Sequence, residues 1–329
     1  MSVRWRSTHR DLMVHNENMG ASVRHNQHVD VAGTGFTVLD RIYTDGSLAD
    51  ESLGGSCGNV LLSLAMLNRQ VAPVLALGDD VEGEQLVCEF ISAGALTHYI
   101  HLRADLRSPV LAQELDTASG LHDFSFVCPE TSADLPRYQP IGETELEFAL
   151  PVLTHCSVFY ADRLSESILE AMKTAWSAGA VVFFEPSDID NETMFNEAMK
   201  MVSVLKYSVD RLGDRLSDIS PRCIRIVTHG AAGLEVRHGT DAHWCRAVNA
   251  PVVLDTCGSG DMVSVGVIDW MISNRIGPDR LTAADLIGGV VAGQRLAAEN
   301  CAYAGARGLF RKRGAGYVRR MLREDPSAA

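Results

Sequence analysis

The chain has 329 residues, of which 46% are hydrophobic and 22% charged, a composition typical of a globular chain that buries a sizeable core. Its formal net charge of −13 argues against binding of nucleic acid or an anionic membrane through a broad basic face, and leaves room only for a local basic pocket that binds phosphate. The 8 cysteines are scattered, with no Cys-x-x-Cys pair and no zinc-like spacing, which indicates buried thiols in a reducing compartment.

The first 28 residues are polar, include four histidines and lack the apolar stretch of a signal peptide. No window of the chain is long and apolar enough to predict a membrane span. We therefore expect a mobile N-terminal tail over residues 1–28 and a cytoplasmic protein with no membrane or nucleic-acid partner. A strand is predicted over Val29–Val38, interrupted by glycines, followed by a small hairpin or lid strand over residues 41–53.

From residue 59 onward, apolar runs of helical and strand length alternate, which predicts βαβ units and a mostly parallel sheet. Short strand-like segments over residues 97–129 interrupt this alternation and are expected to form a second small sheet. From Arg311 the chain is rich in arginine, which predicts an exposed C-terminal tail over residues 311–329. The predicted helices are Asn59–Leu67, Glu82–Ala93, Glu166–Ala178 and Met262–Ile272, and the predicted strands of the main sheet are Val71–Leu77, Cys156–Tyr160, Ala180–Phe184, Val202–Leu205 and Cys223–Thr228.

The most informative segment is Asp255-Thr256-Cys257-Gly258-Ser259-Gly260-Asp261, which precedes a predicted helix with a single charged residue. Its glycines allow the backbone to approach a ligand closely, and the free N–H groups at the helix start favour an anion. A carboxylate there would repel a bound phosphate. The arrangement makes sense if Asp261 must take a proton from a hydroxyl that attacks the phosphate. A structural Gly-rich turn with an aspartate at the helix start would show the same pattern without that chemistry.

Three further features are candidates for binding or for structure. Gly54-Gly55-Ser56-Cys57-Gly58-Asn59 opens an apolar helix, where Asn59 either binds ligand hydroxyls or caps the helix. Asp40, taken as the end of the first strand, and Asp162, after the strand Cys156–Tyr160, are predicted at the edge where the carboxyl ends of parallel strands meet. Gly78-Asp79-Asp80-Val81-Glu82-Gly83 is interpreted as a structural strand-to-helix turn.

Together these segments resemble the ribokinase-like (PfkB) carbohydrate kinase family. Four of the family's motifs occur in the right order: Gly-Gly-x-x-x-Asn at 54–59, a Gly-x-Asp-x-x-Gly-type turn at 78–83, Thr-x-Gly-x-x-Gly at 228–233, and Asp-Thr-x-Gly-Ala-Gly-Asp at 255–261. The resemblance covers residues 30–310. It implies an α/β fold, the ribokinase-like three-layer α/β/α arrangement with a mostly parallel central sheet and a small β-sheet lid, as one kinase domain over residues 29–310.

The resemblance also implies a function: an ATP- and Mg²⁺-dependent carbohydrate kinase that transfers the γ-phosphoryl group to a hydroxymethyl of a sugar, and that forms a homodimer through the lid. Asp261 corresponds to the catalytic base, and Gly258, Ser259 and Gly260 to the anion hole. Asp255 corresponds to a carboxylate that, in some members, helps to hold a monovalent cation such as K⁺. The matches to the acceptor site are Asp40, Gly54, Gly55 and Asn59, and those to the nucleotide site are Thr228, Gly230 and Gly233, with Lys206 either beside a phosphate or on the surface.

The chain departs from the family pattern at several positions. Ser259 replaces the alanine of the second signature, and Met262-Val263 replaces the usual Ala-Phe. Glu185-Pro186-Ser187 stands where relatives often have Asp-Pro-Asn. Many relatives carry Asn-x-x-Glu, which organises water and Mg²⁺ near the phosphates, where this chain has Ser208 and Arg211. This last departure leaves the metal arrangement open.

Alternatives to the sugar kinase follow from the same residues. A nucleoside acceptor fits the shared motifs, and a non-catalytic nucleotide- or sugar-binding relative with a degenerate metal site fits the change at 208–211. A phosphorylated acceptor would need basic residues near the lid, for which Arg103, Arg107 and Arg163 are the candidates. A dinucleotide-binding dehydrogenase is disfavoured, because no Gly-x-Gly-x-x-Gly follows the first strand.

Overall fold

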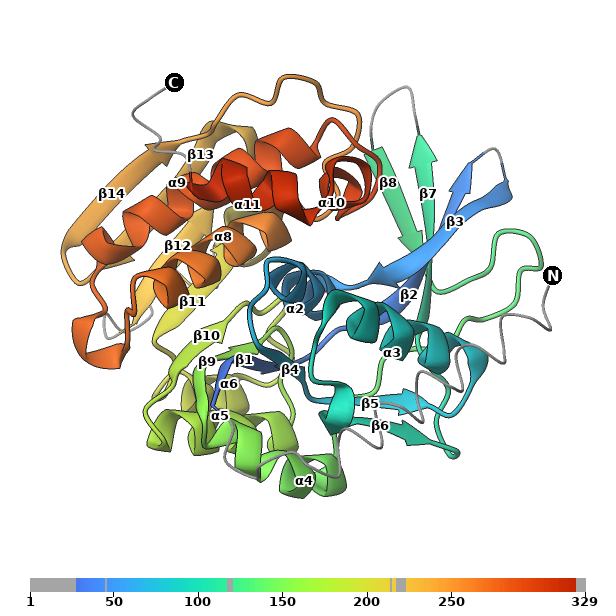
Figure 1. Cartoon of the computed structure of the whole chain (residues 1–329), viewed down its shortest axis with the longest axis horizontal. Helices are drawn as coiled ribbons and strands as arrows, with labels where there is room; N and C mark the ends of the chain where they lie inside the picture. The colour runs from blue at the N-terminus through green and yellow to red at the C-terminus, as the bar shows by residue number, and fades with distance from the viewer. Residues whose placement is uncertain (1–27, 45, 117–120, 214, 217–222, 324–329) are drawn as a thin grey trace.

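The computed structural model describes residues 28–44, 46–116, 121–213, 215–216 and 223–323. Its main sheet has eight strands in the order β14-β13-β12-β11-β10-β9-β1-β4 (Figure 1). Neighbouring strands are parallel from β4 to β12, and β13 and β14 continue the sheet antiparallel. The strands are β1 (Val29–Thr34), β4 (Val71–Pro73), β9 (Cys156–Ala161), β10 (Val181–Phe184), β11 (Val204–Ser208), β12 (Ile224–Thr228), β13 (Gly233–His238) and β14 (Asp241–Arg246).

Helices cover both faces of this sheet, because successive strand residues point to opposite sides and both sides are apolar. Phe183, for example, packs into one core and Phe184 into the other. One layer holds α2 (Ser56–Met66), α3 (Val81–Ala93), α8 (Ser259–Ser273), α9 (Ala283–Asn300), α10 (Gly308–Arg313) and α11 (Ala315–Arg323). The other holds α4 (Glu143–Leu153), α5 (Glu166–Ser177), α6 (Glu192–Ala198) and α7 (Val209–Leu212), and the short 3₁₀ turns are Thr97–Tyr99, Gly230–Ala232 and Pro278–Arg280. The predicted three-layer α/β/α architecture is confirmed.

A separate four-stranded sheet projects from one end of the molecule as the lid (Figure 1). In the order β3-β2-β7-β8, its strands are β3 (Ser47–Gly54), β2 (Val38–Thr44), β7 (Val110–Asp116) and β8 (Leu121–Ser125). The lid therefore combines the two segments expected from the sequence, but the first is longer, from Val38 to Gly54, and the second is shorter, from Val110 to Ser125. The predicted strand Tyr99–Leu102 is not part of it: β6 (Ile100–Arg103) pairs instead with β5 (Leu75–Gly78) in a two-stranded sheet.

Two predicted strands each divide between two sheets. In Val29–Val38, β1 ends at Thr34 and the last residue already belongs to the lid. In Val71–Leu77, β4 ends at Pro73, and β5 begins two residues later in the small sheet. Proline has no N–H to extend a strand ladder, which explains the second break at an edge strand.

The prediction of an exposed tail is wrong for residues 311–323. These residues complete α10 and form α11, in which Val318 is fully buried and Met321 is 7% exposed. The two apolar residues are three positions apart and so lie on one helix face, which packs into the core beside α9. The predicted N-terminal tail lies outside the described residues except for His28, and residues 324–329 also lie outside them.

The packing of α11 leads to the first prediction. Val318→Ala should lower the free energy of unfolding by about 2 kcal/mol, because it removes two buried methyl groups and leaves a cavity. Arg320→Ala, on the exposed face of the same helix, should change it by less than about 0.5 kcal/mol. Denaturant unfolding of the two variants measures both values, and equal effects would contradict a packed C-terminal helix.

Candidate active site

The start of α8 is the centre of the candidate site. Its N-cap, Gly258, has φ 70°, and a Cβ there would lie 2.4 Å from the Cβ of Ala306. Only glycine fits both the left-handed backbone and the close approach of the 305–307 segment. Ser259, Gly260 and Asp261 then form the first helical turn, so the structure brings all four predicted catalytic positions to one helix end.

Asp261 points into a group of polar side chains from three other parts of the chain. Its Oδ2 accepts a hydrogen bond of 2.8 Å from Nδ2 of Asn59, on α2. Burial, together with the negative charge of Glu185, raises the pKa of the Asp261 carboxyl from its ordinary value of 3.8 to about 7, whereas Asn59 and Lys206 act in the opposite direction. A carboxyl that titrates near neutral pH is suited to accept a proton in that range.

Lys206 and Glu185 form a buried ion pair next to the helix start. Lys206 is only 2% exposed, so its prediction as a possible surface lysine is wrong. A Cβ on Gly260 would lie 3.6 Å from Nζ of Lys206 and 4.0 Å from Oε1 of Glu185. The hydroxyl groups of Tyr160 and Ser264 both donate to Oε2 of Glu185, which holds the carboxylate in place. This ion pair therefore lies directly beside the predicted anion hole.

The predicted acceptor residues gather where the lid strands meet the start of α2. Asp40 does not end the first strand: it lies inside the lid strand β2, opposite Ser52 of β3. The two glycines fit around it and its neighbours, because a Cβ on Gly54 would lie 1.8 Å from Oδ2 of Asp40, and Gly55 has φ 78° with its Cβ position 2.3 Å from the Phe36 carbonyl oxygen. A small cavity between the lid and the C-terminal segment is lined by Asp40, Ile42, Ser52, Leu53, Asn59, Gln113, Gly305, Ala306, Arg307 and Arg311.

Asp162 lies close by but has a structural role. Its carboxylate accepts hydrogen bonds from the backbone N–H groups of Phe36 and Cys57 and from the hydroxyl of Ser56. It thus caps the first turn of α2 and holds the loop that leads from the main sheet into the lid. Burial raises the pKa of this carboxyl, and the adjacent Arg163 guanidinium acts against that shift.

The other predicted nucleotide residues lie where β12 ends and β13 begins. Thr228 is the last residue of β12, and Gly230 and Gly233 both have positive φ values, 56° and 125°. A Cβ on Gly233 would lie 2.3 Å from the carbonyl oxygen of Cys245, so glycine is required for the pairing of β13 with β14. The ring of Trp244 lies 5.0 Å from that of His229, which leaves an aromatic surface next to this turn.

Asp255 is buried and joins two loops. Its Oδ1 accepts the N–H of Cys257 at 2.7 Å, and its Oδ2 accepts the N–H of Gly305. In contrast, Ser208 ends β11 as the N-cap of the short helix α7, and Arg211 lies in α7 and is exposed. The described part of the chain contains no cluster of three or more His, Cys, Asp or Glu side chains that could hold a metal ion.

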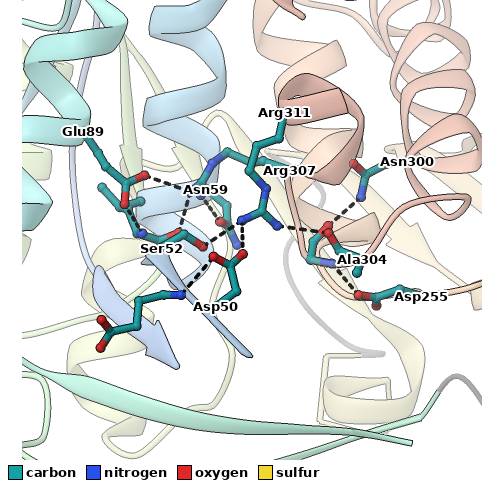
Figure 2. A network of polar contacts seen from close by, with 12 residues as sticks. Asp50, Ser52, Asn59, Glu89, Asp255, Asn300, Ala304, Arg307 and Arg311 are labelled. Atoms are coloured by element: carbon teal, nitrogen blue, oxygen red, sulfur yellow. Dashed lines mark hydrogen bonds and ion pairs between the residues drawn. The ribbon is translucent and has the colours of Figure 1, made fainter. Parts of the chain in front are cut away.

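Arg307 was not singled out by the sequence, yet it lies at the centre of this site. It is 5% exposed, and its guanidinium donates to Oδ1 of Asn59, to the carbonyl oxygen of Leu53 and, at 3.4 Å, to Oε2 of Glu89 (Figure 2). In the sequence, the only local indication that this segment matters is that glycines flank Ala306-Arg307 after an apolar helix. A single arginine in such a segment is usually exposed, so sequence alone could not place it.

A larger and more open cavity lies elsewhere, between β6 and the start of α4. Its polar residues are engaged with one another, because Glu145 pairs with His101 at 3.5 Å and with Arg103 at 3.8 Å. It contains none of the residues that the sequence motifs indicate.

Among the described helices, none is both long and apolar enough to cross a membrane.

Comparison with known proteins identifies the family of the chain. The profile of the pfkB family carbohydrate kinases matches residues 46–308, and the chain belongs to this family. No curated protein sequence matches the chain significantly.

Three solved structures illustrate the similarity of fold. The ATP-bound fructokinase of Xylella fastidiosa has a TM-score of 0.70 at 19% identity, over 90% of this chain and 99% of its own. The Salmonella enterica aminoimidazole riboside kinase, solved with aminoimidazole riboside and an ATP analogue, has a TM-score of 0.68 at 19% identity, over 89% and 99%. The Burkholderia thailandensis nucleoside kinase, solved with inosine, has a TM-score of 0.65 at 16% identity, over 84% and 92%.

The raised pKa of Asp261 predicts how stability depends on pH. The unfolded carboxyl ionises near pH 4, whereas the folded one holds its proton to about pH 7, so the folded state is penalised increasingly as the pH rises through this window. Asp261→Asn should therefore stabilise the protein, and more at about pH 8 than at about pH 4. Thermal unfolding at the two pH values tests this, with Asp269→Asn on the same helix as control. A gain that is equal at both pH values would contradict the shift.

Proposed function

We propose that the protein is an ATP-dependent kinase that transfers the γ-phosphoryl group to a hydroxymethyl of a sugar. The main support for this proposal is the position of Asp261. This residue, with a pKa of about 7, lies at the N-terminus of α8 beside Lys206. The helix end and the lysine would attract the phosphates of ATP, and the carboxylate would face the attacking hydroxyl. Membership of the pfkB family supports a phosphotransferase.

The proposed mechanism follows from these positions. Oδ2 of Asp261 is held by Asn59, so Oδ1 is available to take the proton of the acceptor hydroxyl. The acceptor oxygen bonds to the γ-phosphorus as the bond to the β-phosphate oxygen breaks, which releases ADP. Backbone donors of the 258–260 turn would stabilise the charge on the transferred group. Because the N–H of Ser259 already bonds to the Thr256 carbonyl, most of this work would fall to its neighbours.

Mg²⁺ is expected with ATP, but the chain offers few ligands for it. Of the carboxylates beside the anion hole, Asp261 is bonded by Asn59 and Glu185 by Lys206, and Arg211 replaces the glutamate found in many relatives. Mg²⁺ commonly takes only one or two protein carboxylates together with substrate phosphates and water. We therefore infer that the ATP phosphates, together with water, would supply most of the ligands of Mg²⁺. The ion would in turn neutralise part of the phosphate charge.

A K⁺ requirement through Asp255 stays a proposal. Both of its carboxylate oxygens accept backbone N–H groups, which fixes the carboxylate beside the 256–258 turn where the cation would lie.

A sugar is favoured over a nucleoside as the acceptor because of the residues that line the cavity next to Asn59. Its polar lining includes Asp40, Gln113 and Asn59, and none of its lining residues is aromatic. Carboxylate and amide groups suit the hydroxyls of a polyol, whereas a base would need a stacking surface. A nucleoside remains the second candidate, because two of the similar structures were solved with aminoimidazole riboside and inosine.

A phosphorylated acceptor ranks third. Arg103 is paired with Asp105 and Glu145 on the small β5–β6 sheet, and the side chain of Arg107 is 72% exposed. Arg163 stacks over the ring of Phe36 at 4.7 Å and donates to the carbonyl of Asp162. These three arginines therefore do not form one anion-binding cluster.

Exposed apolar side chains on the lid support the proposal of a homodimer through this sheet. Leu48, Phe124 and Val127 are 42%, 50% and 41% exposed, on β3, on β8 and just after β8. Burying such residues against a second copy would be favourable. Sedimentation or size-exclusion measurements would determine the oligomeric state.

The proposed base predicts the outcome of one direct experiment. Formation of ADP from Mg-ATP should depend on an acceptor in a panel of sugars, nucleosides and sugar phosphates. Asp261→Asn should keep ATP binding but lose about 10²–10⁴-fold in turnover, the usual contribution of a general base. Asp269→Asn, two turns further along α8 and bonded to Arg69, is the matched control and should stay active. Unchanged turnover in Asp261→Asn would refute its assignment as the base, and ATP binding without turnover in any arm would favour the non-catalytic alternative.

The two glycines of the anion hole should respond differently to substitution by alanine. Gly260→Ala should fold normally, since its methyl would lie 3.6 Å from the nearest atom, yet turnover should fall at least about 100-fold because the methyl points toward the phosphate position. Gly258→Ala should lower stability by about 2 kcal/mol or more, because of its φ of 70° and the clash with Ala306. Unfolding and ADP-formation assays on both variants separate the effects. Wild-type turnover in Gly260→Ala would contradict the anion hole.

A further inference from the structure

Arg307 connects three separate parts of the candidate site (Figure 2). Its guanidinium bonds Asn59 on α2, the carbonyl oxygen of Leu53 on the lid strand β3, and Glu89 on α3. Glu89 in turn accepts the N–H of Leu53, so the peptide groups of the lid strand are held on both sides. An arginine this deeply buried is costly to desolvate, and burial lowers the pKa of its guanidinium. Packing alone therefore does not explain why an arginine is buried at this position.

The donor chemistry of arginine determines which way Asn59 faces. A guanidinium has five donors and no acceptor, so the atom of Asn59 that it contacts must be the amide oxygen. The amide nitrogen of Asn59 is thereby turned toward Asp261, whose Oδ2 accepts from it at 2.8 Å. If Asn59 were free to turn over, its oxygen would face the carboxylate, an arrangement in which an ionised Asp261 is repelled. Arg307 thus selects the amide orientation that suits the ionised base.

We propose that Arg307 is a positioning residue for phosphoryl transfer: through Asn59 it orients the carboxylate of Asp261, and through Leu53 it ties that orientation to the lid strand. This inference rests on the proposed function, in which Asp261 is the base. Arg307 itself is expected to touch neither the phosphate nor the attacking hydroxyl. Its effect on turnover should therefore pass through Asn59.

Several charged or titratable groups face Asp261 besides Arg307, and they set the background for any change in pH dependence. Lys206 lowers the pKa of this carboxyl, and Glu185 and Asp162 raise it. The thiols of Cys57 and Cys257 also lie within electrostatic range. None of these groups changes when Arg307 is replaced. Loss of the guanidinium removes a positive charge and a fixed N–H donor together, so both effects raise the pKa of Asp261.

A matched pair of arginines tests the proposal. Arg307→Met removes every donor but keeps an apolar stem, and Arg307→Lys keeps the charge and one donor. The control is Arg319→Met, because Arg319 makes the same kinds of contact at the opposite end of α2: one backbone carbonyl, of Met66, and one asparagine oxygen, of Asn68.

We expect Arg307→Met to lower kcat about 100-fold, the usual cost of misplacing a reacting group by about 1 Å, while KM for ATP changes less than about twofold. The rise of kcat with pH should shift to higher pH, because the base form of Asp261 appears later. Arg307→Lys should recover part of both changes, and Arg319→Met should match the wild type in kcat and pH profile. Wild-type kcat and pH profile in Arg307→Met would overturn the proposal.

A double-mutant cycle separates positioning from general destabilisation. If Arg307 acts through Asn59, the variant Asn59→Ala/Arg307→Met should be no slower than Asn59→Ala alone. Losses that multiply in the double variant would overturn the proposal. Arg307→Lys in the same cycle supplies the answer if the methionine variant does not fold.

A measurement independent of activity keeps this test apart from that of the proposed function. If wild-type protein forms no acceptor-dependent ADP, the proposed function fails. The inference about Arg307 is then decided by titrating the Asp261 carboxyl by ¹³C NMR in wild type, Arg307→Met and Arg319→Met. A midpoint raised only in Arg307→Met supports the positioning role, and an unchanged midpoint overturns it.

Discussion

The buried carboxylate of Asp255 determines where the rest of the candidate site lies. By accepting the N–H groups of Cys257 and Gly305, it holds together two loops that are almost 50 residues apart in the chain. One loop leads into α8, whose first turn contains Asp261. The other leads into α10 and contains Arg307. The contact is tight enough that Gly258 admits no side chain against the opposite loop. This joint therefore holds the 305–307 segment against the start of α8, where the proposed anion hole and the network around Asn59 lie.

Charge balance is the second constraint on the site. Asp261 and Glu185 lie near each other where a phosphate is expected, which would be unfavourable if both were ionised and unpaired. Lys206 compensates Glu185, and the shared field leaves Asp261 partly protonated near neutral pH. The ionised base form of Asp261 is therefore unfavourable in the folded protein at neutral pH. Stability is thus lost at the position where the chemistry is proposed, a common trade-off in enzymes.

The lid and the C-terminal segment complete the side of the candidate site where the acceptor is proposed to bind. Asp40 reaches the cavity from β2, and Leu53 of β3 is bonded by Arg307. Arg311 adds a second link to the same lid strand, since it donates to Asp50 at 2.8 Å (Figure 2). The segment that looks like a basic tail in the sequence therefore begins with a residue that links the lid to the body of the molecule. The contacts of Arg307 with the lid strand and with Asn59 join this side of the site to the proposed base.

The sequence by itself determined the fold class and the local parts of the site, because these depend on short-range patterns. Alternating apolar runs predicted the mostly parallel sheet, and Gly258–Asp261 are close enough in the chain for their spacing to place the proposed base at a helix start. Only the tertiary structure decided that Asp40 lies inside a lid strand, that Lys206 is buried, and that Arg307 orients Asn59. These facts depend on contacts between residues up to 248 positions apart. No local pattern records such contacts, because they are set by how the layers pack and by which buried charges must find partners.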